Sequence, residues 1–251
     1  MNTRKAHMAT LMLAIGLSGT AQAALQGRDL DGNLSTSEAY YDTVLDITWL
    51  ADANYAKTSG YDADGLMKWD EANTWAANLS FTDGVHTYNN WRLPTVEPVN
   101  GVSFNYGFSY SGSADEGYNI TSPQSAMAYM FYVNLGNPSN HTTAGIESGC
   151  FVNTSDTCLD NTGPFSNIVP DDVYWSATVY PQNNERAWSF YMYDGAQRVI
   201  LKFNNKPAWA VSPGDVGIAV TVAVPEADTW VTILVGLGFV GAAARRRGLM
   251  G

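Results

Sequence analysis

The chain has 251 residues, of which 24 are acidic and 13 are basic, and its net charge is −11. This length suffices for one sizeable domain or at most two small ones. A surface so acidic repels nucleic acid and anionic lipid, and we therefore exclude nucleic acid as a partner.

Residues 1–23 have the three parts of a secretory signal peptide. Arg4 and Lys5 form a positive start, an apolar run follows, and Ala21 and Ala23 are the small residues that signal peptidase needs at its cleavage site. A buried N-terminal helix is the alternative. The agreement of all three parts favours a signal peptide, and we predict that the protein is exported.

Two Asp-rich segments resemble parts of calcium loops. Segment 29–33 (DLDGN) does not fit an EF-hand, because its sixth loop position is Leu34 rather than glycine and its twelfth is Tyr40 rather than glutamate. Segment 62–65 (DADG) also lacks the rest of such a loop. We interpret both as turns, so the sequence predicts no cofactor, with calcium as an open alternative.

A strand and a helix are the first regular elements that we expect. Over residues 40–50 a turn is followed by polar and apolar side chains that alternate with period two, which predicts a strand whose apolar side chains, including Leu45 and Trp49, face the core. Residues 51–65 are expected to form a loop. Residues 68–79 carry apolar side chains at helical spacing and predict a helix.

The sequence WRLPT at residues 91–95 follows this helix. Pro94 forces Leu93 towards an extended conformation and ends a strand there. The insert at 101–119 is rich in Gly, Ser and Tyr, and we interpret it as an ordered surface loop. Residues 122–135 return to helical spacing and predict a second helix.

Cys150 and Cys158 are the only cysteines of the chain, and both lie in a long segment without regular pattern at 137–172. In an oxidising compartment two cysteines eight residues apart favour a local disulfide. A zinc site is the competing interpretation, but two cysteines without nearby histidines cannot complete a tetrahedral zinc shell.

The last third of the domain is predicted to be β-structure. Four short strands are expected at 174–178, 187–193, 198–203 and 208–211, with turns between them. Short strands joined by turns are typical of an antiparallel meander.

An apolar run of 15 residues at 230–244 is followed at once by Arg245, Arg246 and Arg247. As a helix this run spans about 22 Å, somewhat less than the ~30 Å hydrocarbon core of a bilayer. Three arginines would hold its end on the cytoplasmic side. We therefore predict a C-terminal transmembrane helix.

Pro225 and Glu226 precede this run, and together with the arginines they resemble a PEP-CTERM sorting signal at 224–251. The resemblance implies an exosortase as partner, a transient stay in the inner membrane of a Gram-negative-type bacterium, and a final place at the cell surface or in the extracellular matrix. Ala227 replaces the usual second proline, which leaves the processing site open. Residues 24–223 alone would carry a net charge of −14.

Four motifs occur in fixed order, namely WRLPT at 91–95, YWSAT at 174–178, AWSF at 187–190 and AWAV at 208–211. Together they resemble the Lcl C-terminal domain family of bacterial secreted modules over roughly residues 39–215. The resemblance implies an α+β, C-type-lectin-like single domain at 24–223, with two helices and an antiparallel β meander, between the signal peptide and the transmembrane sorting helix. It also implies a distant similarity to the formylglycine-generating enzyme group. Binding of sulfated glycans, associated with this family, is disfavoured by the acidic charge.

The sequence contains no visible catalytic constellation. Without the signal peptide, His86 and His141 are the only histidines, and the motifs of metalloproteases, esterases and P-loop proteins are absent. We therefore predict that the protein is not an enzyme. An enzyme on a fold related to the formylglycine-generating group is kept as an alternative.

Trp91, Trp175, Trp188 and Trp209, together with Arg92, are the candidate ligand-binding residues. Indole faces stack on sugar rings, although tryptophan is also a large core residue, and period-two positions within strands favour the core.

The predicted function is carbohydrate binding in the exopolysaccharide or biofilm matrix, by an exported protein whose partners are an exosortase and extracellular polysaccharide. Recognition concentrates on loops over a rigid scaffold, so we expect the contacts near the loops at 137–172. The alternative is a structural or interaction protein of the cell envelope without a glycan ligand, for which buried tryptophans suffice.

Overall fold

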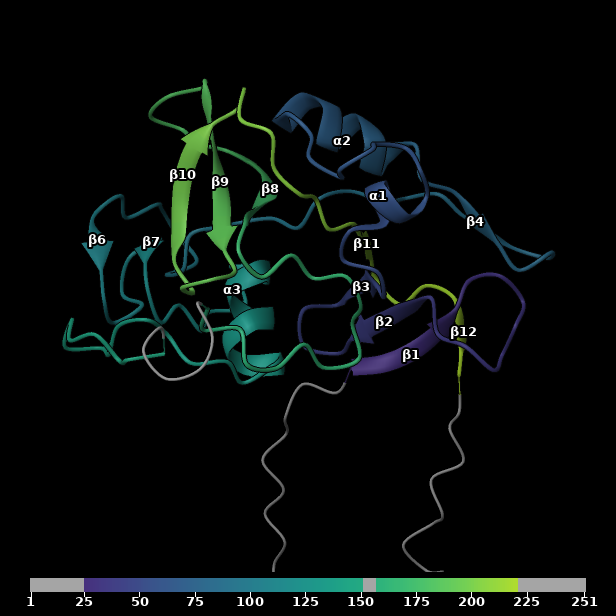
Figure 1. The fold of residues 1–251 in the computed structure, drawn as a ribbon, viewed down its shortest axis with the longest axis horizontal. Helices are drawn as coiled ribbons and strands as arrows, with labels where there is room; N and C mark the ends of the chain where they lie inside the picture. The colour runs from purple at the N-terminus through teal and green to yellow at the C-terminus, as the bar shows by residue number, and fades with distance from the viewer. Residues whose placement is uncertain (1–24, 151–156, 221–251) are drawn as a thin grey trace, which may run out of the picture.

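A computed structural model describes residues 25–150 and 157–220 of the chain. The predicted signal peptide and sorting segment, including the span at 230–244, lie outside the described residues. The described part is α+β, with two five-stranded sheets, a two-stranded hairpin and a few short helices (Figure 1). None of its helices has the length and apolar character that crossing a membrane requires.

The first sheet joins the two ends of the described chain. Its strand order is β11-β3-β2-β1-β12, and every pairing in it is antiparallel. The strands are β1 (Leu25–Asp29), β2 (Ala39–Asp42), β3 (Ile47–Leu50), β11 (Val211–Pro213) and β12 (Ile218–Ala219). Because β12 pairs with β1, the first and last described strands lie side by side.

One predicted strand is corrected in this sheet. The strand expected within 40–50 is two strands, β2 and β3, joined by a turn. Leu45 therefore lies in the turn and not in a strand, because the Asp42 carboxylate accepts the backbone N–H groups of Val44 and Leu45. All four residues of β3 are buried, so this strand lacks the predicted alternation of faces.

The second sheet has the order β6-β7-β10-β9-β8. Its strands are β6 (Phe108–Ser109), β7 (Glu116–Gly117), β8 (Val173–Val179), β9 (Arg186–Tyr191) and β10 (Gln197–Leu201). Strands β8, β9 and β10 form the predicted antiparallel meander. The insert at 101–119 is ordered, as expected, and supplies β6 and β7.

The fourth strand predicted for this meander is wrong. Residues Ala208, Trp209 and Ala210 are fully buried, and the chain then enters β11, which pairs with β3 in the first sheet. The segment crosses between the sheets: Ala210 C=O accepts the Leu50 N–H at 3.1 Å, whereas Pro207 C=O accepts the Trp175 N–H at 3.2 Å.

The two predicted helices are present but shorter than expected. They are α2 (Trp69–Ala77) and α3 (Ala126–Tyr129), which continues as the π-helical turn η1 (Met130–Asn134). Helix α3 begins later than residue 122 because Ser125 still bridges Val96. The loop at 51–65 contains the unpredicted helix α1 (Tyr55–Thr58), and β4 (Phe81–Thr82) and β5 (Thr87–Tyr88) form the hairpin.

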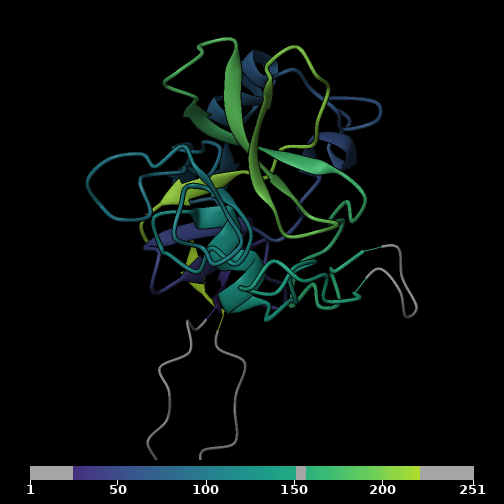
Figure 2. The same ribbon diagram turned by 90° about the vertical axis from the view of Figure 1, so that its left-hand side faces the viewer.

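Helix α3 and turn η1 connect the two sheets, as Figures 1 and 2 show. At the N-terminal end, Ser125 Oγ donates to Gln197 Oε1 of β10. At the other end, Asn134 Nδ2 donates to Asp42 Oδ2 of β2 at 2.5 Å. Large buried side chains from both sheets, such as Trp49 and Trp175, pack in one shared core together with Trp209.

The WRLPT segment also spans the sheets. Arg92 exchanges two backbone hydrogen bonds of 2.8 Å with Val211 of β11. Two residues later, Pro94 C=O accepts the Ala177 N–H of β8 at 2.9 Å. The predicted disulfide is confirmed between Cys150 and Cys158, whose Cα atoms are 5.1 Å apart.

Candidate functional site

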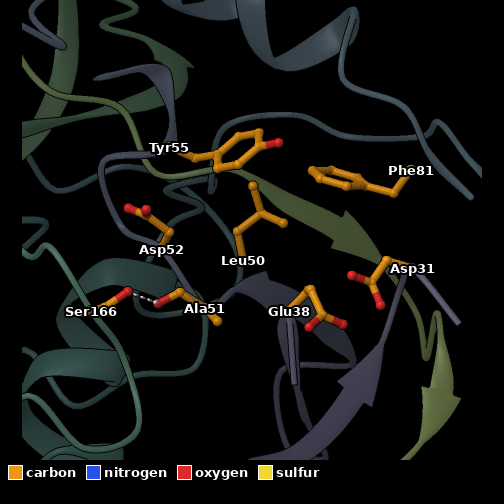
Figure 3. Close-up of a pocket in the computed structure, with 8 residues that line it drawn as sticks. All are labelled: Asp31, Glu38, Leu50, Ala51, Asp52, Tyr55, Phe81 and Ser166. Atoms are coloured by element: carbon orange, nitrogen blue, oxygen red, sulfur yellow. Dashed lines mark hydrogen bonds between the residues drawn. The ribbon is translucent and has the colours of Figure 1, made fainter. Parts of the chain in front are cut away.

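A pocket of about 290 Å³ opens beside the first sheet, where β3, α1, the hairpin β4–β5 and the β1–β2 loop meet (Figure 3). Its floor is Leu50, the last residue of β3, which is 2% exposed. Acidic side chains flank this floor: Asp31 and Glu38 lie on one side of Leu50, and Asp52 lies on the opposite side. The pocket is therefore built from segments that are far apart in the sequence.

Two aromatic rings form one wall of the pocket. Tyr55 from α1 and Phe81 from β4 are both half-buried, and their ring centroids are 5.5 Å apart with the planes tilted by 47°. Behind Phe81, the ring of Trp91 packs edge-on at a centroid distance of 5.3 Å. The indole N–H of Trp91 donates to Tyr88 C=O at 3.0 Å, which fixes the orientation of the indole. The first residue of the WRLPT motif thus supports a pocket wall.

The floor of the pocket rests on Trp209. Its indole N–H donates to Leu50 C=O at 2.8 Å, and its ring contacts Trp49 at 4.8 Å and Phe165 at 4.7 Å between centroids. Next to Phe165, Ser166 exchanges backbone hydrogen bonds with the segment after β3: its N–H donates to Ala51 C=O at 2.8 Å. Buried aromatic packing therefore determines the shape of the pocket.

The carboxylates differ in how firmly they are held. Asp52 Oδ1 accepts the Asn54 N–H at 2.8 Å, and Asp52 Oδ2 accepts the side-chain amide of Asn167 at 2.8 Å. Glu38 Oε2 accepts the Leu30 N–H at 3.1 Å. Within residues 25–150 and 157–220, the carboxylates of the pocket form no ion pair. Each carboxylate oxygen can accept more than one hydrogen bond, so acceptor capacity remains for a ligand.

A hydrogen-bonded turn positions the hairpin that carries Phe81. Asp83 Oδ1 accepts the backbone N–H groups of His86 and Val85 at 2.6 and 2.7 Å, and Asp83 Oδ2 accepts the Tyr88 hydroxyl at 2.6 Å. The His86 N–H, then the Tyr88 hydroxyl and the His86 ring, hold the pKa of Asp83 well below its usual range. Burial and the Asp83 carboxylate raise the pKa of Tyr88 to about 12, so its hydroxyl stays a donor.

The β1–β2 loop brings a third carboxylate near Asp31 and Glu38. One carboxylate oxygen each of Asp29, Asp31 and Glu38 lie within 4.8 Å of one another. Asp29 Oδ1 accepts three backbone N–H groups, those of Asp31, Gly32 and Asn33. Asp29 Oδ2 is buried and has no hydrogen-bond partner. These three side chains are the residues that could hold a metal ion.

The tryptophans that the sequence nominated as ligand contacts lie in the interior. Trp175, Trp188 and Trp209 are 0% exposed, and Trp91 is 3% exposed. No indole face is therefore open to a ligand, because all four rings pack in the core or against its aromatic neighbours. The expectation that these four tryptophans stack on a sugar is therefore corrected: their rings are buried and pack inside the fold.

Arg92 lies away from the pocket just described. It is half-buried and lines a separate pocket with Glu97, and its guanidinium donates to Leu93 C=O at 3.0 Å. Burial lowers the pKa of Arg92, an effect that the neighbouring Glu97 carboxylate opposes. The structure does not bring Arg92 together with the pocket carboxylates.

Sequence reasoning missed most of the pocket. Tyr55, Phe81 and Asp52 carry no motif, and only their position in the fold brings them together. The single usable signal was the Asp-rich segment 29–33. Of the long loops at 137–172, where contacts were expected, Ser166 lines the pocket.

The arrangement suits a sugar ring. Aromatic faces and the Leu50 floor can cover the apolar C–H face of a pyranose, while carboxylate oxygens accept its hydroxyl groups.

Comparison with known proteins identifies a family over most of the chain. The Lcl C-terminal domain family matches residues 38–212, which include every pocket residue except Asp31. No curated protein and no solved structure matches the chain.

Proposed function

We propose a function from one premise, that this chain belongs to the Lcl C-terminal domain family, which matches residues 38–212. This family is not an enzyme family, and membership indicates a secreted or surface protein related to carbohydrate. The function proposed for this chain is binding of extracellular carbohydrate, in the exopolysaccharide or biofilm matrix, through the pocket over Leu50. A C-type-lectin-like classification of its α+β fold is part of the same proposal.

The observation that carries this function is that one concave site combines two half-buried aromatic rings with carboxylates. Among the described residues, these carboxylates form no ion pair. Tyr55 and Phe81 supply rigid apolar surface at low cost in conformational entropy. Asp31, Glu38 and Asp52 supply acceptors that a hydrophobic ligand would leave unused. A sugar can use both, because its C–H face packs on the rings and its hydroxyl groups donate to the carboxylates.

The negative charge of the pocket favours carbohydrates that carry no negative charge. Among the described residues no basic side chain lines it, whereas three carboxylates do. Sulfated or uronic-acid polymers would bring like charges together, which is unfavourable. The proposed ligands are therefore neutral or amino sugars within an extracellular polysaccharide.

Export and sorting complete the proposal. Residues 1–23 would direct secretion, residues 24–223 would form the binding domain, and residues 224–251 would hold the chain in the inner membrane until an exosortase acts on it. These roles are supported by the sequence pattern of the terminal segments, namely the small-residue cleavage site, the Pro225–Glu226 motif and the arginine cluster at 245–247.

A structural role in the envelope without a glycan ligand is the second candidate. The burial of Trp91, Trp175, Trp188 and Trp209 favours it, because those residues need no ligand to explain them. The two candidates differ in whether the pocket has an occupant.

The test is a pair of matched substitutions in purified residues 24–223, which contain every described residue. Phe81→Ala should weaken binding to the polysaccharide of the producing bacterium at least about tenfold, equivalent to about 1.4 kcal/mol, since a half-buried aromatic ring of the pocket wall is lost. Phe203→Ala removes a ring that is 67% exposed and away from the pocket, and it should leave the affinity unchanged. Binding would be measured by calorimetry.

Two outcomes count against the proposal. Absence of saturable binding by the unsubstituted protein would favour the structural role. Equal losses in both variants would place the binding surface outside the pocket.

A further inference from the structure

Three carboxylates lie close together at the loop that joins β1 to β2. Asp29 ends β1, Asp31 follows in the loop, and Glu38 directly precedes β2. The antiparallel pairing brings Glu38 back to the start of the loop, since its N–H donates to Arg28 C=O at 3.0 Å. The three carboxylate oxygens lie within 4.8 Å of one another. Oxygens on opposite sides of one calcium ion, each about 2.4 Å away, are separated by about the same distance.

The strongest sign of a missing partner is Asp29. Its side chain is 0% exposed, and its Oδ1 already accepts three backbone N–H groups. Its Oδ2 is buried and has no hydrogen-bond partner within residues 25–150 and 157–220. A buried carboxylate oxygen with no partner is costly, and two further carboxylates beside it increase that cost. A cation bound between the three carboxylates would remove both the cost of the unpartnered oxygen and the repulsion between the carboxylates.

We propose that Asp29, Asp31 and Glu38 form a calcium site at the rim of the pocket. Hard oxygen donors in a flexible loop suit calcium, which accepts six to eight oxygen ligands and tolerates irregular geometry, better than magnesium, which demands an octahedron. Waters complete the coordination. The site differs from an EF-hand because its third carboxylate comes from the tenth loop position, Glu38, and not from the twelfth.

The chain carries a natural control for this site. The turn at Asp62 has the same local geometry: Asp62 Oδ1 accepts the backbone N–H groups of Asp64, Gly65 and Leu66. Asp64 Oδ1 in turn accepts the Leu66 N–H, as Asp31 Oδ1 accepts the Asn33 N–H. Among the residues that the structure describes, this second turn gathers no third carboxylate. It should not bind calcium.

Calcium would also change the pocket. Asp31 and Glu38 belong to both sites, so the ion would neutralise part of the acidic rim and offer its open coordination positions to sugar hydroxyls. This consequence rests on the proposed carbohydrate function, whereas the calcium site itself does not.

Calcium binding is therefore tested without polysaccharide. Calcium chloride is titrated into chelator-treated residues 24–223 by calorimetry, and we expect one site with a dissociation constant of about 10⁻⁴–10⁻³ M, as in extracellular modules. Asp31→Asn and Glu38→Gln should each weaken binding at least tenfold. Both changes keep an acceptor oxygen, and unchanged circular dichroism would show that the variants fold. Asp64→Asn should bind as the unsubstituted protein does.

Several results would overturn the site. They are the absence of saturable calcium binding, unchanged affinity in both Asp31→Asn and Glu38→Gln, and an equal loss in Asp64→Asn. Magnesium that binds as tightly as calcium would contradict the choice of ion. Calcium binding with no affinity for polysaccharide would keep this site and remove only the carbohydrate function.

Discussion

Phe81 and Leu50 owe their positions in the pocket to two buried tryptophans. Trp91 packs against the Phe81 ring, and Trp209 donates its indole N–H to Leu50 C=O. Both indoles are buried, yet each determines the position of a pocket residue. At the scale of residues, Trp91 and Trp209 of the family motifs are therefore structural supports for a pocket that is lined by other side chains.

Replacement of Trp209 should test this support. Trp209→Ala leaves a large cavity next to Trp49 and Phe165 and an unpaired Leu50 carbonyl, so we expect a loss of about 3–5 kcal/mol in the free energy of unfolding. The exposed Phe203→Ala should change it by less than about 0.5 kcal/mol. Denaturant unfolding measures both, and similar losses in the two variants would contradict the assignment.

The hairpin with Phe81 should respond to acid through Asp83. The pKa of Asp83 is depressed in the folded protein, so its contribution to stability is present above the unfolded value of about 3.9 and is lost as the pH falls through the folded pKa. Asp83→Asn should therefore destabilise the protein at pH 7, and this difference should shrink below about pH 4. Nuclear magnetic resonance titration should show that the Asp83 carboxylate stays ionised over the pH range in which an unperturbed aspartate becomes protonated. A midpoint near 3.9 would refute the depressed pKa.

At the scale of elements, the spacing of apolar residues predicted those helices and strands whose position depends on the local sequence. Helix α2 and strands β8, β9 and β10 were expected near their observed places. The predicted apolar face of α2 buries Ala72, Trp75 and Ala76, and the three strands lie between the predicted turns. The strand at 208–211 failed because a fully buried crossing segment has the same apolar composition as a strand. The turn between β2 and β3 was missed because side-chain caps from Asp42 do not interrupt the alternation.

The disulfide is an element whose contribution can be measured separately. It closes a short loop within 137–172, and the chain-entropy estimate for such a loop is about 2–3 kcal/mol. The double variant Cys150→Ser, Cys158→Ser should lose about that much stability in thermal unfolding. Polysaccharide affinity should persist, because Ser166 is held by backbone hydrogen bonds to Ala51 and Ala53. An unchanged melting temperature would show that the bond does not stabilise the fold.

At the scale of the whole molecule, the pocket is a product of topology. Its residues come from the β1–β2 loop, the end of β3, α1, the hairpin and the segment around Ser166, which no sequence window contains together. The ordered motifs predicted the family: WRLPT and AWAV link the two sheets, and YWSAT and AWSF lie in strands β8 and β9 of the second sheet. They could not predict the pocket, because its lining residues lie outside those motifs.

Another surface of the described chain carries two neighbouring exposed aromatic side chains. In the insert at 101–119, Phe108 is 44% exposed and Tyr110 is 39% exposed, and their ring centroids are 5.1 Å apart. The pocket is preferred as the carbohydrate site because it is concave and combines rings with carboxylates. A measurement that maps the contact therefore decides between the two surfaces.

That measurement is hydrogen–deuterium exchange of residues 24–223, with and without the extracellular polysaccharide. We predict slower exchange in peptides that cover 29–38, 50–55 and 81–88, and unchanged exchange in the insert at 101–119. Protection confined to that insert, or no protection in any peptide at saturating polysaccharide, would contradict the claim that the pocket over Leu50 binds carbohydrate.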